Sequence, residues 1–311
     1  MSELDPFHAG ERAVQERLGE TDEAARNGRA LSTSIVRGAL PFIAQQSFAV
    51  LATVDEEGAP WASLVFGEPG FLSAPDPEHV QLDTTRARIP EGSPWTEHLE
   101  RDPRLGMLFI EPGSRRRLRV NGRAQRTPNA WHVDVREAYP NCPKYIRRRE
   151  LTTELDSPGA SVEWRRGAVL EPAHLELIRS ADTTFVASAA PGGELDASHR
   201  GGEPGFVRVL ESPHGAALEI PDYPGNHMYN TLGNFELEPR AGLVFLDFES
   251  GRVLQLGGQV RVDWKKPAAS ERTGGTERLW CFTVERWVEH RLPVNWRWES
   301  FDASPYNPPA F

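Results

Sequence analysis

The sequence predicts a mainly β protein with flanking helices (α+β), built from two tandem small β-barrels. Short apolar runs alternate with turns that hold many of the 27 glycines and 26 prolines, which favours strands over long helices. The motif GEPGF occurs at 67–71 and again at 202–206. Because five matching residues can reflect chance or a shared turn preference, the duplication needs support at other positions.

Three further segments recur with nearly the same spacing. The pairs are PRLGMLF at 103–109 with PRAGLVF at 239–245, LRVNG at 118–122 with LQLGG at 254–258, and FAVLA at 48–52 with TTFVA at 183–187. Ordered matches at an offset of 135 or 136 residues are hard to obtain by chance. A period this long predicts a duplicated domain and not a solenoid of short repeats.

Each copy contains the same elements in the same order. An apolar strand is followed by an acidic, glycine-containing turn, an alternating strand, the GEPGF turn and another strand. A polar stretch with helical character (WTEHLERDP or NFELEP) then leads into two more strands, GMLFI with RLRVNG and GLVFL with VLQLGG. Several short strands at this spacing, with turn signals between them, are typical of a small barrel.

The repeat also divides the chain into predicted domains. Helices are expected at 8–30 and near 131–150, where the second helix would link the copies. The predicted organisation is an N-terminal helical segment at 1–40, a first barrel at 41–130, a helical linker at 131–177, a second barrel at 178–265, and a C-terminal segment at 266–311 that packs on the barrels.

Composition restricts the classes of partner. The formal net charge of −10 argues against nucleic acid or an anionic membrane surface as the main partner, although a local basic cluster can still hold a small anion. Two cysteines, Cys142 and Cys281, are too few for a disulfide framework or a four-ligand zinc site, so no metal site is expected. A reducing cytoplasm is the predicted location, because the charged N-terminus has no apolar core like that of a signal peptide.

Known catalytic fingerprints are missing from the sequence. No dinucleotide-binding, P-loop, HExxH or GxSxG motif occurs in the context that it needs. The nine histidines are scattered without a convincing metal-ligand spacing. The catalytic residues therefore stay unassigned at the level of the sequence.

The order of motifs resembles the pyridoxamine 5′-phosphate oxidase-like FMN-binding split-barrel family. LATVDEEGAPWASLVFG, a strand, a polar loop, PRxGxxF and a glycine-containing strand occur in this order, and the resemblance covers both copies, about 40–130 and 178–265. The second copy is similar to a tandem-barrel, flavin-nucleotide-binding branch. The resemblance implies six-stranded antiparallel barrels that pair, with FMN in the groove between them. With this family pattern, a tandem repeat would supply both split barrels from one chain as an intrachain pseudo-dimer. Pairing of two chains as a homodimer stays open.

The two copies differ where the family binds phosphate. Aligned on GEPGF, Ser198, His199 and Arg200 stand opposite Ser63, Leu64 and Val65. A basic residue at the end of this strand binds the FMN phosphate in the family, so the resemblance makes Arg200 the leading candidate, with Ser198 as a hydroxyl partner. The planar fork of arginine suits phosphate because it donates two hydrogen bonds at fixed charge. A surface ion pair is the alternative for Arg200. His199 is a further cofactor-binding candidate because a histidine near a flavin could donate a proton or a hydrogen bond, and simple packing is its alternative.

The loop after the next strand adds further cofactor-binding candidates. Asn230 and Thr231 stand where the family has two basic residues, so phosphate binding would rest on neutral donors together with Arg200. The loop GNHMYNTLGN also contributes Asn226, Tyr229 and Asn234, although a turn that satisfies its own backbone is the alternative.

The first copy lacks these groups and has Pro94 and Trp95 at the corresponding places. The resemblance therefore implies one competent FMN site, in the second copy. Lys144, in the segment YPNCPKYI after the first barrel, could reach the phosphate or the edge of the isoalloxazine across the pseudo-dimer.

Three functions are compatible with these residues. The first is an FMN-dependent oxidoreductase with a small-molecule redox substrate and NAD(P)H as a candidate electron donor, because FMN itself performs the transfer and the protein positions it. The second is a non-catalytic flavin-binding protein for storage or redox sensing. The third keeps the fold and exchanges the ligand for a deazaflavin or haem.

Overall fold

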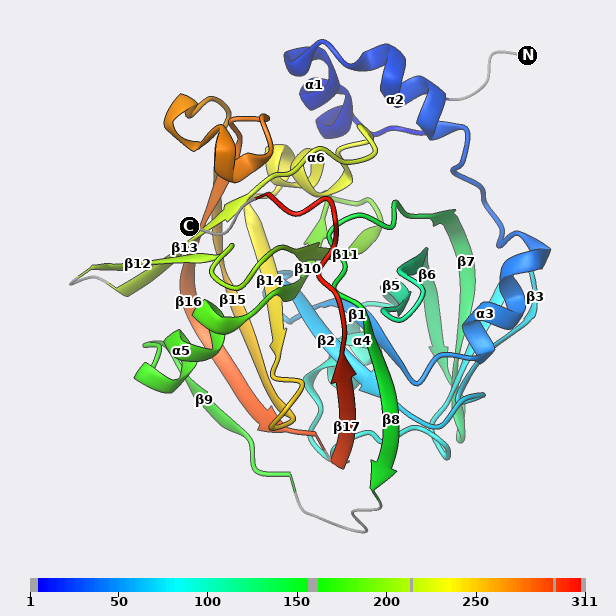
Figure 1. Ribbon diagram of the computed structural model, residues 1–311. Helices are drawn as coiled ribbons and strands as arrows, with labels where there is room; N and C mark the ends of the chain where they lie inside the picture. Colours follow the sequence, from blue (N-terminus) through cyan, green and yellow to red (C-terminus); the bar gives the residue numbers. More distant parts are fainter. Residues whose placement is uncertain (1–4, 156–161, 213–214, 293–294, 309–311) are drawn as a thin grey trace.

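Two antiparallel sheets dominate the computed structural model, which describes residues 5–155, 162–212, 215–292 and 295–308 (Figure 1). The first sheet has seven strands in the order β2-β1-β5-β6-β7-β4-β3. Their bounds are Phe48–Val54 (β1), Pro60–Phe66 (β2), Leu72–Asp76 (β3), His79–Asp83 (β4), Arg104–Glu111 (β5), Arg116–Arg126 (β6) and Ala130–Pro140 (β7).

The second sheet repeats this order as β11-β10-β14-β15-β16-β13-β12, and the short strand β9 (Arg165–Gly167) pairs with β16. Its bounds are Thr183–Ala189 (β10), Leu195–Gly201 (β11), Arg208–Ser212 (β12), Gly215–Pro221 (β13), Arg240–Leu246 (β14), Arg252–Asp263 (β15) and Leu279–Arg291 (β16). Matching β1–β7 to β10–β16 makes the two strand orders identical. The predicted fold class, two tandem split barrels in a mainly β chain, is therefore confirmed.

Helices cover the ends of the barrels. They are α1 (Ala9–Leu18), α2 (Thr21–Gly28), α3 (Leu40–Ala44), α4 (Pro94–Arg101), α5 (Pro172–Ser180) and α6 (Asn230–Leu237), with 3-10 turns η1 (Arg37–Ala39), η2 (Pro267–Ala269) and η3 (Glu271–Thr273). The helix expected at 8–30 is two helices, because Gly19 ends α1 in the left-handed conformation at φ 69°. No helix within the described ranges is long and apolar enough to span a membrane.

Apolar side chains form a core inside each barrel and a third cluster between them. Every residue of β1 is buried, because Leu51 points into the first barrel while its neighbour Val50 joins the shared cluster. The shared cluster also contains Ala187 and Val244 of the second barrel. A strand buried on both faces reads as a continuous apolar run, which explains FAVLATV. The copies thus pack through β1, β2 and β5 against β10, β11 and β14.

Two glycines of the repeated PRxG motif allow this close packing. A Cβ on Gly106 would lie 2.3 Å from the carbonyl oxygen of Leu195, and a Cβ on Gly242 would lie 2.6 Å from that of Pro60. The contacts are equivalent in the two copies, since β5 meets β11 as β14 meets β2. The repeated glycine is therefore a consequence of an intrachain pseudo-dimer with two-fold character.

The predicted helical linker and one barrel boundary are wrong. Residues 130–140 form β7, in which buried residues alternate with more exposed ones from 131 to 136. The charged residues on its outer face made a strand of period two look helical. β8 (Arg149–Leu155) pairs with β17 (Asn295–Ser300) in a separate two-stranded sheet. The second barrel also extends past residue 265, because β16 is one of its strands.

Candidate functional site: an arginine-lined pocket between the barrels

A pocket opens where the end of β11 meets β6 of the first barrel. It is lined by Arg117 and Arg119 of β6, by the segment 141–145, by residues 198–201 of β11, and by parts of the segment 221–232 that joins β13 to α6. We call this the arginine pocket. Both copies contribute to it, so it depends on the pseudo-dimer.

The arginine pocket brings together most of the predicted cofactor-binding residues. Those that line it are Lys144, Ser198, His199, Arg200, Asn226, Tyr229, Asn230 and Thr231. Asn234 lies on the buried side of α6 and does not line the pocket. Its amide instead donates to Ser188 Oγ at 2.9 Å and to Asp196 Oδ2 at 2.8 Å. The placement leaves the binding role of all nine residues a prediction.

Two arginines of the pocket were missed from the sequence. Arg117 and Arg119 project from β6 of the first barrel, which was assigned no ligand. The repeat held a signal for both of them, because at the offset of 136 residues Arg117 stands opposite Val253 and Arg119 opposite Gln255. The same contrast of a cation in one copy with a neutral residue in the other had identified Arg200.

Arg119 is buried at the interface between the barrels, where both terminal nitrogens of its guanidinium are hydrogen-bonded and only Nε has no partner among the described residues. Its guanidinium donates to the Tyr139 hydroxyl at 2.6 Å, to Asp196 Oδ1 at 3.0 Å and to Ser198 Oγ. Ser198 in turn lies 3.0 Å from Thr231 Oγ1. Arg119 therefore joins β6 of the first barrel to β11 and α6 of the second, and Asp196 balances its charge.

Arg117 and Arg200 lack such a counter-charge. Arg117 donates to the carbonyl of Cys142 and to His199 Nδ1, and the side chain of Arg200 has no hydrogen bond to a described residue. The Nε atoms of both are inaccessible to solvent and have no partner in the described parts of the chain. Burial, together with the neighbouring cations Arg119 and Arg200, lowers the pKa of Arg117 to about 9. Burial also lowers the pKa of Arg200, although Asp222 opposes the shift.

His199 is neutral and presents a donor. Burial first, and then Arg117 and Arg200, hold the pKa of His199 well below its usual range. Because the Arg117 guanidinium donates to Nδ1 at 3.3 Å, the ring proton lies on Nε2. That atom is buried and has no partner among the described residues. The pocket therefore contains cations and an unused N–H donor, a combination that favours an anion.

Backbone strain gathers around the same pocket. Three of its lining residues are non-glycine residues with positive φ, Tyr145 at 67°, His227 at 60° and Tyr229 at 65°. Such conformations are rare outside glycine and asparagine and persist only where surrounding contacts hold them. Tyr145 is held by a hydrogen bond from its hydroxyl to the carbonyl of Pro224 at 2.9 Å. Strain at a pocket is typical of a site that is shaped for a ligand.

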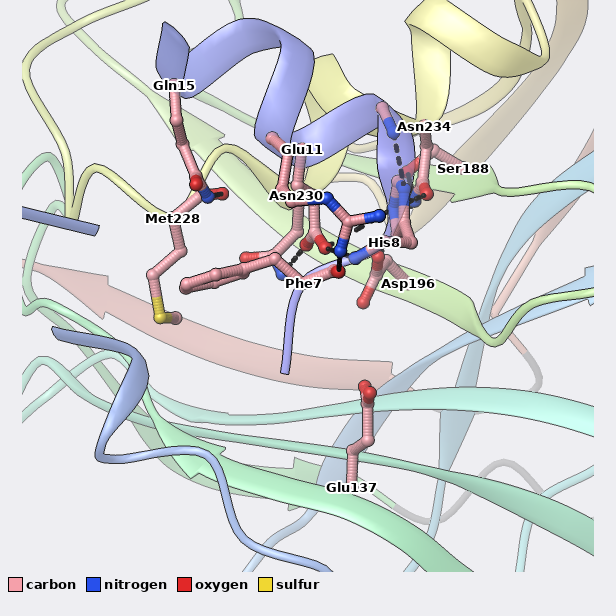
Figure 2. Close-up of polar contacts among 12 residues, drawn as sticks. Phe7, His8, Glu11, Gln15, Glu137, Ser188, Asp196, Met228, Asn230 and Asn234 are labelled. Atoms are coloured by element: carbon pink, nitrogen blue, oxygen red, sulfur yellow. Dashed lines mark hydrogen bonds and ion pairs between the residues drawn. The ribbon is translucent and has the colours of Figure 1, made fainter. Parts of the chain in front are cut away.

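A polar network lies directly behind the pocket (Figure 2). His8 Nε2 donates to Asn234 Oδ1 at 3.0 Å, and Asn230 Nδ2 donates to Glu11 Oε1 at 2.6 Å. Figure 2 shows Glu137 pointing from the first barrel toward Asp196 and the N-terminal segment. Burial and the Asp196 carboxylate raise the pKa of Glu11 to about 8 and that of Glu137 to about 7.

The corresponding place in the first copy is filled by apolar or neutral side chains. Leu64, Val65, Trp95, Val253 and Gln255 stand where the arginine pocket has His199, Arg200, Thr231, Arg117 and Arg119. All five are buried. Gln255 Nε2 donates to Ser63 Oγ at 2.8 Å, which mirrors the bond of Arg119 to Ser198. The first copy therefore has the equivalent hydrogen bond across the interface, but it has valines where the arginine pocket has Arg117 and Arg200.

Comparison with known proteins gives a family match for the first barrel. The family model for pyridoxamine 5′-phosphate oxidase matches residues 38–138. None of the curated proteins compared with the chain matches it. Among solved structures, HupZ of Group A Streptococcus is 16% identical with a TM-score of 0.32, and the match covers 38% of this chain and 92% of that one.

Two further solved structures are similar over the length of about one barrel. A protein related to general stress protein 26, from Clostridium acetobutylicum, is 14% identical with a TM-score of 0.28, covering 41% of this chain and 89% of that one. HutZ, the haem storage protein from Vibrio cholerae, is 14% identical with a TM-score of 0.26, covering 38% of this chain and 89% of that one. The family match therefore assigns residues 38–138, the first barrel, to the pyridoxamine 5′-phosphate oxidase-like split-barrel family, as the order of motifs predicted.

Proposed function

We propose that this protein is an FMN-binding oxidoreductase and that the arginine pocket holds the phosphate of the flavin. The observation that carries the proposal is the pair Arg117 and Arg200, two inward-facing cations with no carboxylate hydrogen-bonded to them in the described chain. A protein with a net charge of −10 has many carboxylates that could have paired with them. An anion from outside the chain is therefore the natural counter-charge.

A phosphate monoester fits the donors of the pocket. Burying charge without a partner is costly, and an anion that accepts hydrogen bonds from both arginines would offset that cost. Guanidinium groups match phosphate oxygens because they donate in a planar fork. His199 Nε2–H and the Thr231 hydroxyl add neutral donors, which can take the place of the second and third cations of related sites.

When bound, FMN supplies hydride or electron transfer. The chain contributes binding and orientation: Arg117 and Arg200 would hold the phosphate, and the segment 226–231 would fix the ligand from the side of α6. A small-molecule redox substrate, an electron donor such as NAD(P)H and pairing of two chains as a homodimer belong to the same proposal. Storage or sensing of flavin without turnover is its non-catalytic alternative.

One contact favours a flavin phosphate over haem. A histidine that ligates haem iron offers the lone pair of an unprotonated ring nitrogen. The hydrogen bond from Arg117 to Nδ1 places the proton of His199 on Nε2, so this atom is a donor. A deazaflavin carries a phosphate as well, and its binding is an outcome that the experiment below can distinguish.

Titration with FMN and riboflavin tests the proposal, because the two ligands differ only by the phosphate. We expect FMN to bind at one site per chain and riboflavin to bind far more weakly. Arg200→Ala should weaken FMN binding by about 1.5–3 kcal/mol, the scale of a hydrogen bond to a charged group, and leave riboflavin binding unchanged. Val65→Ala, the matched change in the first copy, should leave both affinities unchanged. Equal affinity for the two ligands would refute the phosphate assignment.

Mass spectrometry of the ligand released by heating the purified protein identifies any flavin, deazaflavin or haem acquired during expression. Reduction of the bound flavin by NADH or NADPH, followed by reoxidation by an acceptor, would support an oxidoreductase. A flavin that neither nucleotide reduces would favour the non-catalytic alternative.

A further inference from the structure

We propose that the N-terminal helices α1 and α2 are part of the ligand site, with Glu11 and Glu20 as positioning residues that hold the segment 226–231 in its binding conformation. We call this segment the pocket loop. The inference rests on the proposed function, because it concerns the same pocket. It assigns a role to residues that lie far from the pocket loop in the sequence and do not line the pocket themselves.

The N-terminal segment contacts the pocket loop at nearly every residue. The hydrogen bonds are Asn27 Nδ2 to the Asn226 carbonyl at 2.7 Å, Glu20 with His227 Nδ1 at 2.5 Å, Gln15 Nε2 to the Met228 carbonyl at 3.1 Å, the Tyr229 hydroxyl to Glu20, and Asn230 Nδ2 to Glu11 at 2.6 Å. Figure 1 shows α1 lying beside α6, and Figure 2 shows the side chains of α1 reaching Met228 and Asn230. Because these hydrogen bonds reach five of the six residues of the pocket loop, the N-terminal segment acts as a support that sets the loop conformation. We call this support the N-terminal template.

Glu20 holds both strained residues of the pocket loop. Its Oε2 atom accepts hydrogen bonds from the His227 ring and from the Tyr229 hydroxyl. These two residues have φ values of 60° and 65°, which non-glycine residues rarely adopt without support from their surroundings. One carboxylate thus fixes the loop on either side of Met228. Loss of this carboxylate should release the loop toward conformations in which Tyr229 no longer faces the pocket.

The carboxylate of Glu20 is ionised at neutral pH. Burial acts to raise its pKa, but the hydrogen bonds from Tyr229 and His227 outweigh burial, and the pKa is lowered. Arg278 lies over the Tyr229 ring at 5.5 Å and also favours the ionised form. Glu20 therefore accepts both hydrogen bonds across the neutral pH range.

Glu11 fixes the first residue of α6. Asn230 uses one amide hydrogen for Glu11 Oε1, which leaves its other amide hydrogen and its carbonyl oxygen for the pocket. Glu11 itself is held by the backbone N–H of His8, which donates to Oε2 at 2.9 Å in the cap of α1. The orientation of a predicted ligand-binding amide is therefore set by a residue of α1.

Close backbone packing makes the N-terminal template rigid. A Cβ on Gly10 would lie 2.1 Å from the carbonyl oxygen of Gly233, and a Cβ on Gly233 would lie 2.6 Å from the backbone nitrogen of Glu11. The helices α1 and α6 therefore touch through their backbones at a site where larger residues would not fit. Arg17 and Glu236 add an exposed ion pair at 2.5 Å between the same helices.

Glu20→Ala tests the inference, with Glu23→Ala as its matched control. Glu23 lies on α2 and pairs with Arg26, without a hydrogen bond to the pocket loop. We expect Glu20→Ala to raise the dissociation constant for FMN about tenfold, to speed hydrogen exchange in residues 226–231, and to leave exchange in the barrel strands unchanged. Glu20→Gln keeps an acceptor oxygen and should restore part of the affinity. Glu23→Ala should behave as the wild type in both measurements.

The outcomes separate the two proposals. Wild-type protein that binds no FMN overturns the proposed function, and the exchange data then decide the positioning role alone. Unchanged FMN affinity and unchanged loop exchange in Glu20→Ala overturn the positioning role while the proposed function stands. If Glu20→Ala does not fold, Tyr229→Phe, which removes only the hydroxyl that donates to Glu20, must show the same faster exchange in the pocket loop.

Discussion

The interface between the barrels contains two equivalent places, the arginine pocket and its counterpart in the first copy, which share their backbone arrangement and differ in their side chains. On one side, Arg119 donates to Ser198 beside two unpaired arginines, Arg117 and Arg200. On the other side, Gln255 donates to Ser63, and the surrounding positions are apolar. Duplication supplied two equivalent places, and only one of them kept unpaired charge. The comparison teaches that the fold alone is insufficient for the site, because the backbone is shared and the cations are not.

The largest expected effect is on stability, at the first-copy counterpart of the arginine pocket, which apolar side chains fill. Trp95 is 2% exposed and packs on Trp131 with ring centroids 6.2 Å apart. Trp95→Thr gives the first copy the residue of its counterpart, and the lost packing should lower the free energy of unfolding by about 3–5 kcal/mol. Urea denaturation measures the loss. The variant should gain no FMN site, because Val65 and Val253 provide no cation; a second FMN per chain would contradict the role given to charge.

The next effect separates the halves by affinity. Arg117→Ala should weaken FMN binding by about 1.5–3 kcal/mol, because a buried charged donor is lost from the pocket. Val253→Ala, at the equivalent position of β15, should lower stability through a small cavity and leave FMN affinity unchanged. Calorimetric titration of both variants measures the difference. Equal losses of affinity would show that both halves contact the flavin.

The halves should respond alike where the architecture is shared. Gly106→Ala and Gly242→Ala each place a methyl group against a carbonyl of the opposite barrel, so each should cost about 1–3 kcal/mol of stability. Urea denaturation of the two variants checks the equivalence. If one substitution is tolerated and the other is severe, the two-fold character of this contact is wrong.

The smallest expected effect is the change of stability per pH unit that comes from two buried groups, His98 and Glu11. Their pKa shifts destabilise the protein at opposite ends of the pH range. Burial lowers the pKa of His98 to about 4, so stability from this group is lost as pH falls from 6.5 toward 4. Burial and Asp196 raise the pKa of Glu11 to about 8, so stability from Glu11 is lost as pH rises from about 4.5 through 8.

Each group should contribute a slope of at most about 1.4 kcal/mol per pH unit. His98→Asn, which introduces the residue of the second copy, should flatten the acidic limb of a stability profile. Glu11→Gln should flatten the alkaline limb and leave the acidic limb in place. Denaturant midpoints measured from pH 4 to pH 9 check both slopes, and an alkaline limb that persists in Glu11→Gln would exclude Glu11 as its source.

Most of the fold could be predicted from the sequence because its motifs occur in two copies. The repeated GEPGF and PRxG motifs predicted two barrels, and every strand named from an apolar run forms. β7 was missed because its outer face is charged, so its period-two pattern was hidden by composition. Membership of the split-barrel family was likewise predicted from the order of motifs and is confirmed over residues 38–138.

Only part of the candidate site could be predicted from the sequence. The sequence pointed to Arg200 because one copy has a cation where the other has valine, and the pocket loop followed from the family pattern. It gave no hint that Arg117 approaches His199, or that Glu20 accepts from Tyr229, because these partners are 82 and 209 residues apart. Asn234 is the one predicted residue that does not line the pocket, since its amide on α6 donates to Asp196, and its binding role stays a prediction.

Sequence by itself determined the duplication, five strands of each copy in their order along the chain, and the copy that carries Arg200. These are properties of local pattern and of comparison between two aligned segments, so they need no knowledge of contacts. The tertiary structure alone decided that β6 of the first barrel completes a pocket of the second and that α1 and α2 brace its loop. Those contacts depend on how two barrels pack through an apolar face, and the charges that end up unpaired are known only once every neighbour is in place.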